Sequence, residues 1–276
     1  MKNRVITGIL LAVVLIPVFY FGGMVLDIVL LLFSMIATWE LNRMFNKEKD
    51  TPKFILFIEM VFSGAIFYAI RSFYLGYIDL ELIFFLVVLL VVVGALSLVF
   101  SEKYSSVEFG NSFVSVLYPS LGFGAISGLR GGFGDDGLYN IGFLFLVTTM
   151  TDMFAYIVGV NFGKHRLAVK ISPKKSIEGS IGGTAFAIIF TMIFIWAFKL
   201  EVIGEIPVHV LSVIGLIIVI SIIGQIGDLV ASKLKRDYGI KDYSNLFPGH
   251  GGVMDRFDSA IFAAMVLMLI SKVVGL

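Results

Sequence analysis

Nine long apolar stretches dominate this 276-residue sequence and limit what it can fold into. About 20 apolar residues are needed for a helix to cross a bilayer. Within a bilayer, a helix satisfies its own backbone hydrogen bonds. The sequence therefore predicts an all-α polytopic integral membrane protein with about nine transmembrane helices. We place them at about residues 5–21, 24–41, 54–71, 82–100, 111–128, 138–160, 181–199, 208–230 and 257–275.

Composition supports this fold class and excludes several kinds of function. The chain is 58% hydrophobic and only 15% charged, which is too apolar for a typical soluble domain of this length. A net charge of +1 gives no global basic field, so nucleic acid is not an expected partner. The absence of cysteine excludes disulfides, thiolate nucleophiles and cysteine metal sites, and three scattered histidines argue against a histidine-rich metal site. The first stretch lacks an evident small-residue cleavage motif, and we interpret it as a retained helix.

Basic residues in the flanks of the stretches predict the orientation of the chain. With a cytoplasmic N-terminus, all but four of the 21 Lys and Arg residues fall inside, because only Arg71, Arg130, Lys199 and Lys272 fall outside. We therefore expect a multi-pass membrane protein whose N-terminus and most basic loops face the cytoplasm. We divide the chain into N-terminal helices, 1–105, and a catalytic region, 106–276, with cytoplasmic loops 161–180 and 231–256.

The eighth stretch ends in polar residues at helical spacing. Ser232 and Lys235 follow Asp228 at +4 and +7, so the three side chains should share one helix face. An ionisable group at this depth needs protein, water or a cation as its partner. Two interpretations stay open: an Asp–Lys pair that stabilises the helix end, or a cation ligand beside a basic group that meets a substrate phosphate.

The segment "FPGHGGVMDRFDSA" then returns the chain to the membrane. Its glycines, including Gly251 and Gly252, allow backbone N–H groups to approach an anion closely. Asp255 and Asp258 follow, and helix-end stabilisation would account for one of them but less well for both. Clustered carboxylates repel unless a cation or proton lies between them. Oxygen ligands without Cys or clustered His favour a hard cation such as Mg²⁺.

Loop 161–180 adds a second polar cluster. Asp152 lies in the apolar stretch before it, and Ser172, Lys174 and Lys175 lie in "SPKKSIEGSIGG". The two lysines either anchor the helices at the cytoplasmic side or bind phosphate. The small residues four apart in "GVNFG" and "GSIGG" favour close helix packing.

These residues resemble the phosphatidate cytidylyltransferase family, also called CDP-diacylglycerol synthase. The family signature has the shape S-x-x-K-R-x-x-x-x-K-D-x-x-x-x-x-P-G-H-G-G-x-x-D-R-x-D, and residues 232–258 match it. "DMFAYIVGVNFGKHRL" and "SPKKSIEGSIGG" also look like family segments, although Ile177 and Ser180 stand where the family often has aromatic residues. The resemblance covers roughly the C-terminal half of the chain.

The resemblance implies a reaction in which CTP and phosphatidic acid give CDP-diacylglycerol and pyrophosphate, with Mg²⁺ as cofactor and bilayer lipid as surroundings. A second cation and a homodimer stay open. Two other functions also stay open: a CTP-dependent lipid kinase and an ion-coupled transporter, for which intramembrane Asp152 and Asp228 would form an ion path. The implied catalytic residues are Asp228, Asp255, Lys235, Arg256 and His250; substrate-binding residues are Lys174, Lys175, Ser232, Arg236, Lys241, Gly251, Gly252 and Ser172; and metal ligands are Asp228, Asp255, Asp258 and Asp152.

Overall fold

The computed structural model describes residues 2–46, 52–132 and 134–274, without the side chains of residues 2–7 and 135. Nine α-helices in these ranges correspond one to one to the nine predicted stretches, which confirms the all-α fold class. They are α1 (Lys2–Phe21), α2 (Gly23–Phe45), α3 (Lys53–Tyr74), α4 (Leu80–Phe100), α5 (Ser106–Gly131), α6 (Gly137–Phe162), α7 (Ile177–Phe198), α8 (Val210–Asp237) and α9 (Met254–Val274).

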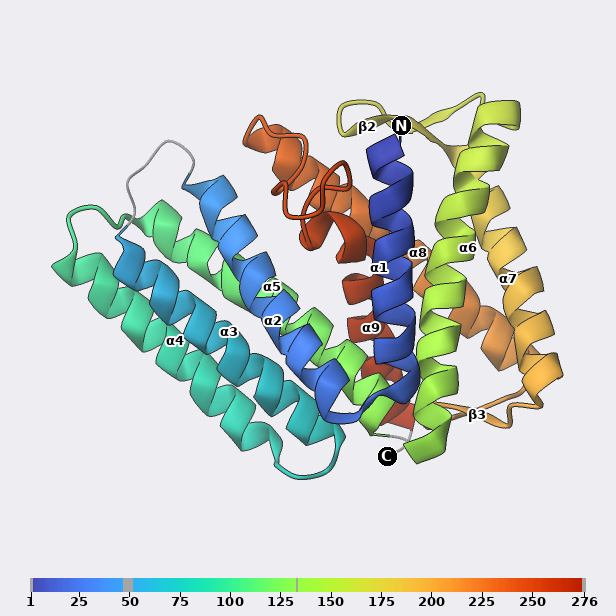
Figure 1. Cartoon of the computed structure of the whole chain (residues 1–276), viewed down its shortest axis with the longest axis horizontal. Coiled ribbons are helices and arrows are strands. Elements are labelled where there is room, and N and C mark those ends of the chain that lie inside the picture. Colours follow the sequence, from blue (N-terminus) through green and yellow to red (C-terminus); the bar gives the residue numbers. More distant parts are fainter. Residues whose placement is uncertain (1, 47–51, 133, 275–276) are drawn as a thin grey trace. The chain divides into compact units, whose positions relative to one another are not determined.

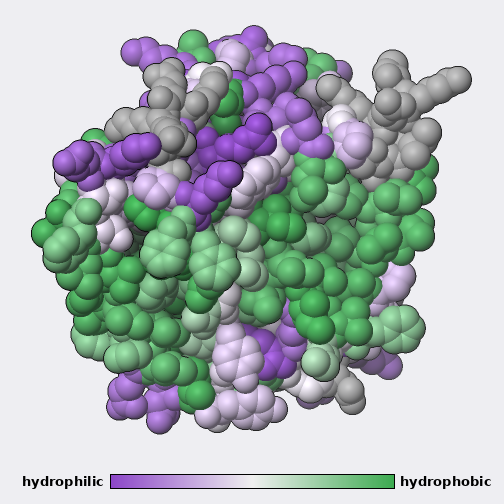
Figure 2. Space-filling view, turned by 60° about the vertical axis from the view of Figure 1, so that its left-hand side comes forward, coloured by the Kyte–Doolittle hydropathy of each residue, from purple (hydrophilic) through white to green (hydrophobic). Residues whose placement is uncertain are grey.

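Eight of these helices, α2 to α9, are long and apolar enough to cross a membrane, and α1 adds the shorter apolar segment Gly8–Phe21. Large hydrophobic side chains are exposed on most of them, as expected where lipid replaces water. Hydrophobic residues dominate the middle of the face shown in Figure 2, and hydrophilic residues gather toward its ends. The predicted sidedness stays a prediction; Lys47 and Lys49 lie outside the described residues, as do the side chains of Lys2 and Arg4.

The chain forms two compact units, and each is discontinuous in sequence. Unit 1 comprises residues 1–132 and 237–257, and unit 2 comprises residues 133–236 and 258–276. These boundaries follow packing, whereas the predicted division at residue 105 concerned function and stays a prediction.

In unit 1, helices α2, α3, α4 and α5 pack side by side (Figure 1). Their apolar core centres on Phe62, Ile66, Ile70, Leu90 and Val116. The helix α5, which carries an internal proline, is the most deeply buried of the candidate spans and the least hydrophobic of them.

A tight link of two glycines joins α1 to α2. Gly22 and Gly23 have φ values of 64° and 60°, which glycine adopts without the steric penalty of a Cβ atom. The guanidinium of Arg130 donates to the carbonyl oxygens of Phe19 at 3.0 Å and Tyr20 at 2.8 Å. These bonds satisfy carbonyls that the end of α1 leaves without helical partners.

In unit 2, α6 and α7 pack closely along their length (Figure 1). Glycine allows this approach, because a Cβ atom at Gly179 or Gly183 would lie 2.5 Å from a backbone oxygen of α6. The predicted packing role of these glycines is thereby confirmed.

Two short hairpins, which the sequence analysis did not predict, lie at the connections of unit 2. One pairs β1 (Arg166–Ala168) with β2 (Ser172–Ser176) between α6 and α7, and the other pairs β3 (Val202–Ile203) with β4 (Ile206–Pro207) between α7 and α8. A 3-10 turn, η1 (Gly134–Asp136), precedes α6.

Candidate functional site

The centre of the polar cluster in unit 2 is Asp228. It lies on the half of α8 that is predicted to be nearer the cytoplasm. Its Oδ2 atom forms an ion pair with Nζ of Lys175, near the end of β2, at 2.5 Å. Its Oδ1 atom accepts from the hydroxyl of Ser232 at 3.3 Å, as helical spacing predicted. Both charged side chains are only 27% exposed, so this ion pair is partly shielded from solvent.

Two more carboxylates join this cluster from neighbouring helices. Ser259 on α9 donates its hydroxyl to Asp152 of α6 at 3.2 Å. Asp258 lies within electrostatic range of Asp228, Asp152 and the buried side chain of Lys235. The unit 2 cluster therefore holds three carboxylates and two lysines, from α6, α8, α9 and β2.

A glycine on α8 makes the last of these approaches possible. A Cβ atom at Gly227 would lie 2.6 Å from the backbone oxygen of Asp258 and 2.8 Å from Cβ of Phe262. Only glycine at this position lets α8 and α9 approach closely enough to bring their acidic side chains near one another.

The donor chemistry of this cluster suits a hard divalent cation, because it offers carboxylate and hydroxyl oxygens without sulfur or imidazole. Within the described residues, however, no three Asp, Glu or His side chains are placed as a ready metal site. One oxygen of Asp228 is taken by the Lys175 ammonium. A cation that binds Asp228 through both oxygens must therefore displace this lysine.

The glycine-rich loop belongs to unit 1 and folds onto itself. The backbone N–H of Phe247 donates to the Gly251 oxygen at 2.9 Å, and that of His250 donates to the Phe247 oxygen at 2.8 Å. Gly249 and Gly251 have φ values of 77° and 81°, in the left-handed region that favours glycine. The glycines thus shape a tight return before α9.

Asp255 holds this loop from its C-terminal side. Its Oδ2 atom accepts the backbone N–H groups of Tyr243 at 2.8 Å and Gly252 at 2.9 Å, and its side chain is buried. In unit 1, Asp255 therefore links both ends of the loop. The predicted shared cation between Asp255 and Asp228 joins residues of different units and stays a prediction.

Glu40 on α2 holds the same loop, and the sequence analysis missed it. Its fully buried carboxylate accepts from Ser244 Oγ at 2.6 Å, Val253 N at 2.9 Å and Met254 N at 2.9 Å. The last two donors belong to the start of α9, where a helix leaves N–H groups unpaired and favours negative charge. An acidic residue within an apolar stretch was the available signal.

The other predicted site residues are divided between the two units. Unit 2 holds Ser172, half-buried, with Lys174 and Arg236, both exposed. Unit 1 holds Lys241 and Arg256, both exposed, with His250, half-buried. The structure thus brings together Asp152, Lys175, Asp228, Ser232, Lys235 and Asp258 in one unit, and Gly251, Gly252 and Asp255 in the other.

Comparison with known proteins covers nearly the whole chain. A model of the protein family described as "Cytidylyltransferase family" matches residues 2–274. A phosphatidate cytidylyltransferase of Staphylococcus aureus (strain COL) is 30% identical over 271 residues, and one of Staphylococcus haemolyticus (strain JCSC1435) is 33% identical over 277 residues. In both cases the match covers 98% of this chain and 98% of the relative.

Proposed function

Because the chain belongs to the cytidylyltransferase family, we propose that it transfers the cytidylyl group of CTP to phosphatidic acid. The products are CDP-diacylglycerol, a precursor in phospholipid biosynthesis, and pyrophosphate. The observation that carries this proposal is the unit 2 cluster, in which Lys175 and Lys235 lie beside Asp152, Asp228 and Asp258. Lysines that can bind phosphate, next to carboxylates that can bind a cation, suit a reaction between two phosphate compounds.

The chemistry requires no nucleophile from the protein. A phosphate oxygen of phosphatidic acid forms a bond to the α-phosphorus of CTP, and the bond to the bridging oxygen breaks as pyrophosphate leaves with the electron pair. Catalysis then depends on positioning and charge neutralisation. Lys175 and Lys235 are placed to meet phosphate oxygens, and the exposed Lys174 and Arg236 extend the basic surface.

Mg²⁺, when bound, would neutralise phosphate charge and orient the triphosphate. Asp228, Asp152 and Asp258 are the unit 2 residues that would hold it, and Asp255 is the proposed ligand from unit 1. Lys175 compensates the charge of Asp228, so a cation that took over this role would leave the lysine available to substrate phosphate.

Incubation of the purified protein with phosphatidic acid, Mg²⁺ and CTP tests this function. CTP labelled in the cytidine should yield a labelled lipid, whereas CTP labelled in the γ-phosphate should yield labelled pyrophosphate and no labelled lipid. A lipid kinase would give the opposite labelling. Ion-driven flux in proteoliposomes without liponucleotide formation would favour a transporter.

We also propose that the protein lies in the inner (plasma) membrane and that the site faces the cytoplasm, where CTP is available. The distribution of basic residues supports this orientation. The chain has no cysteine, so single cysteines report cleanly on sidedness. Cysteines at Lys170 and Lys241 should resist an impermeant thiol reagent in intact cells, and one beyond α9 should react; labelling of the first two would reverse the orientation.

A further inference from the structure

The β1–β2 hairpin of unit 2 joins the ends of two candidate membrane helices, α6 and α7. Its strands pair antiparallel, with Arg166 opposite Ser176 and Ala168 opposite Ser172. The turn between them closes through a hydrogen bond from Ile171 N to Ala168 O at 3.1 Å. β1 begins four residues after α6 ends, so this hairpin starts at the edge of the apolar region.

The base of the hairpin is fixed to both helices. Glu178, in the first turn of α7, accepts the backbone N–H of Lys164 at 3.0 Å and contacts His165 Nδ1 at 2.6 Å. Ile177 N donates to His165 O at 2.9 Å. An isolated two-stranded hairpin is marginal in water, and these contacts supply the support that its own strands lack.

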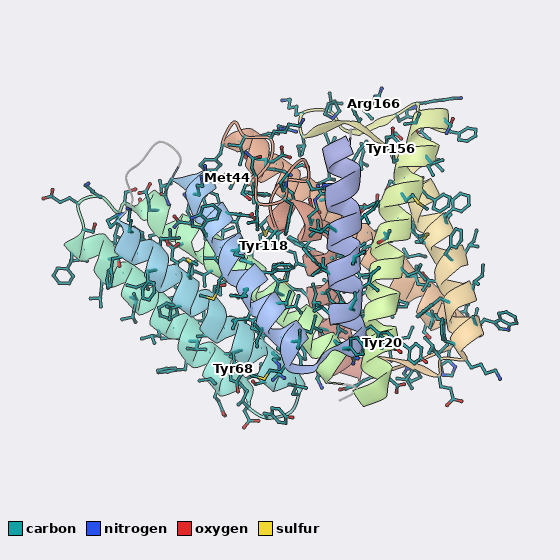
Figure 3. The ribbon with its side chains drawn as sticks, in the orientation of Figure 1. Tyr20, Met44, Tyr68, Tyr118, Tyr156 and Arg166 are labelled. Carbon is teal, nitrogen blue, oxygen red and sulfur yellow. The ribbon has the colours of Figure 1, made fainter. Side chains whose placement is uncertain are left out.

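The tip, by contrast, exposes apolar side chains next to positive charge. Val169 in the turn is 64% exposed and Leu167 is 37% exposed. The basic side chain of Lys170 is exposed beside Val169 in the turn, and that of Arg166 is exposed at the first position of β1, toward the base of the hairpin. Figure 3 shows Arg166 on the hairpin and Tyr156, which is 70% exposed, near the adjoining end of α6.

This combination fits a bilayer headgroup layer better than water. Apolar side chains at the tip gain by leaving water, and Lys and Arg are attracted to anionic lipid. Strand residues rise about 3.3 Å each, so the tip lies on the order of 10–20 Å from the end of α6 when extended. A hairpin that bends toward the membrane plane therefore reaches headgroups without leaving its base.

We propose that the tip of the β1–β2 hairpin docks on the anionic headgroup surface of the leaflet at that end of α6. Val169 and Leu167 enter the interface, while Arg166 and Lys170 meet lipid phosphates. The occupant is the bilayer surface itself, because two exposed cations complement anionic lipid and the apolar side chains complement its interior. This inference stands on the geometry of unit 2 and does not depend on the proposed cytidylyl transfer.

Docking is tested with a nitroxide label on Val169→Cys in the full-length protein. The protein is placed in nanodiscs of phosphatidylcholine alone or mixed with anionic phosphatidylglycerol, and collisions with oxygen and with a water-soluble nickel complex are compared. Anionic lipid should raise access to oxygen and lower access to nickel. Glu201→Cys, exposed before β3 at the other connection of α7, is the control and should stay accessible to nickel in both lipids.

Removing these two charges should weaken the lipid dependence. Each basic side chain near an anionic surface favours docking about fivefold, so Arg166→Gln with Lys170→Gln should weaken it about 25-fold. High salt should have the same direction of effect. Lys199→Gln, which removes a positive charge at the other end of α7, should leave the label response unchanged.

Any of three results would overturn the proposal. One is a Val169 label that is equally accessible to nickel in both lipids. Another is a response to anionic lipid that is undiminished in the Arg166→Gln, Lys170→Gln protein. If CTP, rather than lipid, protects the label, the hairpin binds a soluble polyanion and lipid docking is wrong.

Discussion

Replacing Glu40 by Gln should separate loop positioning from general stability. In the native structure one oxygen accepts from Ser244 Oγ and Val253 N, and the other accepts from Met254 N. The amide retains a single acceptor oxygen, so its NH₂ group faces a buried N–H group. Hydrogen bonds to charged groups contribute about 1.5–3 kcal/mol, and an unsatisfied buried donor costs about 1–3 kcal/mol. We therefore expect Glu40→Gln to destabilise unit 1 by about 2 kcal/mol.

The effect on activity should exceed this loss of stability. The glycine-rich loop that Glu40 holds carries proposed site residues, and a displacement of about 1 Å can reduce a rate by about 10²-fold. The assay is CDP-lipid formation per folded protein at saturating and limiting CTP, with thermal unfolding measured in parallel. We expect a lower kcat in Glu40→Gln. Glu40→Asp keeps the charge on a shorter side chain and should recover only part of the activity.

Glu59→Gln provides the matched control. Glu59 is a second buried carboxylate of unit 1, and it accepts from Asn42 Nδ2 at 2.5 Å and from the hydroxyl of Ser112. Asn42 and Ser112 lie outside the loop, so the loss of the Glu59 charge should lower the unfolding temperature while turnover per folded protein is retained. Unchanged activity in Glu40→Gln, or an equal loss of activity in both variants, would refute the positioning role.

Three other changes test the remaining contacts. Asp228→Asn should reduce the rate of Mg²⁺-dependent CDP-lipid formation on the order of 10²-fold while thermal unfolding shows a retained fold, and near-normal turnover would remove Asp228 from the mechanism. Lys235→Met should lower turnover per folded protein well beyond Lys199→Met, and equal modest effects would return Lys235 to helix anchoring. Gly252→Ala should destabilise and inactivate the protein, because the added Cβ atom would overlap the Glu40 carboxylate that holds the loop. Gly110→Ala is the control: a Cβ atom there has no neighbour within 4 Å, so the unfolding temperature should be unchanged or slightly raised.

Sequence alone predicted the nine helices because apolar length is a local property. The helix ends were less predictable, because they depend on polar contacts. α9 begins at Met254 rather than at about residue 257. Glu40 accepts the backbone N–H group of Met254 at this start of the helix. α8 continues to Asp237 rather than to about residue 230, since its final turns are polar yet helical and include Lys235 and Arg236.

The candidate site was predictable in its residue types and less so in its partners. Helical spacing gave the Asp228–Ser232 contact correctly. The Lys175–Asp228 ion pair depends on a hairpin whose strands of three and five residues carry too little periodicity to be recognised. Glu40 was missed because its partners lie more than 200 residues away along the chain, a pairing that no local pattern contains.

The discontinuity of unit 1 has a consequence for biogenesis. Glu40 enters the membrane with α2, but Val253 and Met254 are translated 213 and 214 residues later. At synthesis rates of about 5–20 residues per second, its carboxylate waits on the order of 10–40 s for these donors. During that interval the nascent protein carries an acidic group in an apolar helix without its final partners, so a truncated chain would expose a polar defect in the bilayer that membrane proteases and insertion chaperones can recognise.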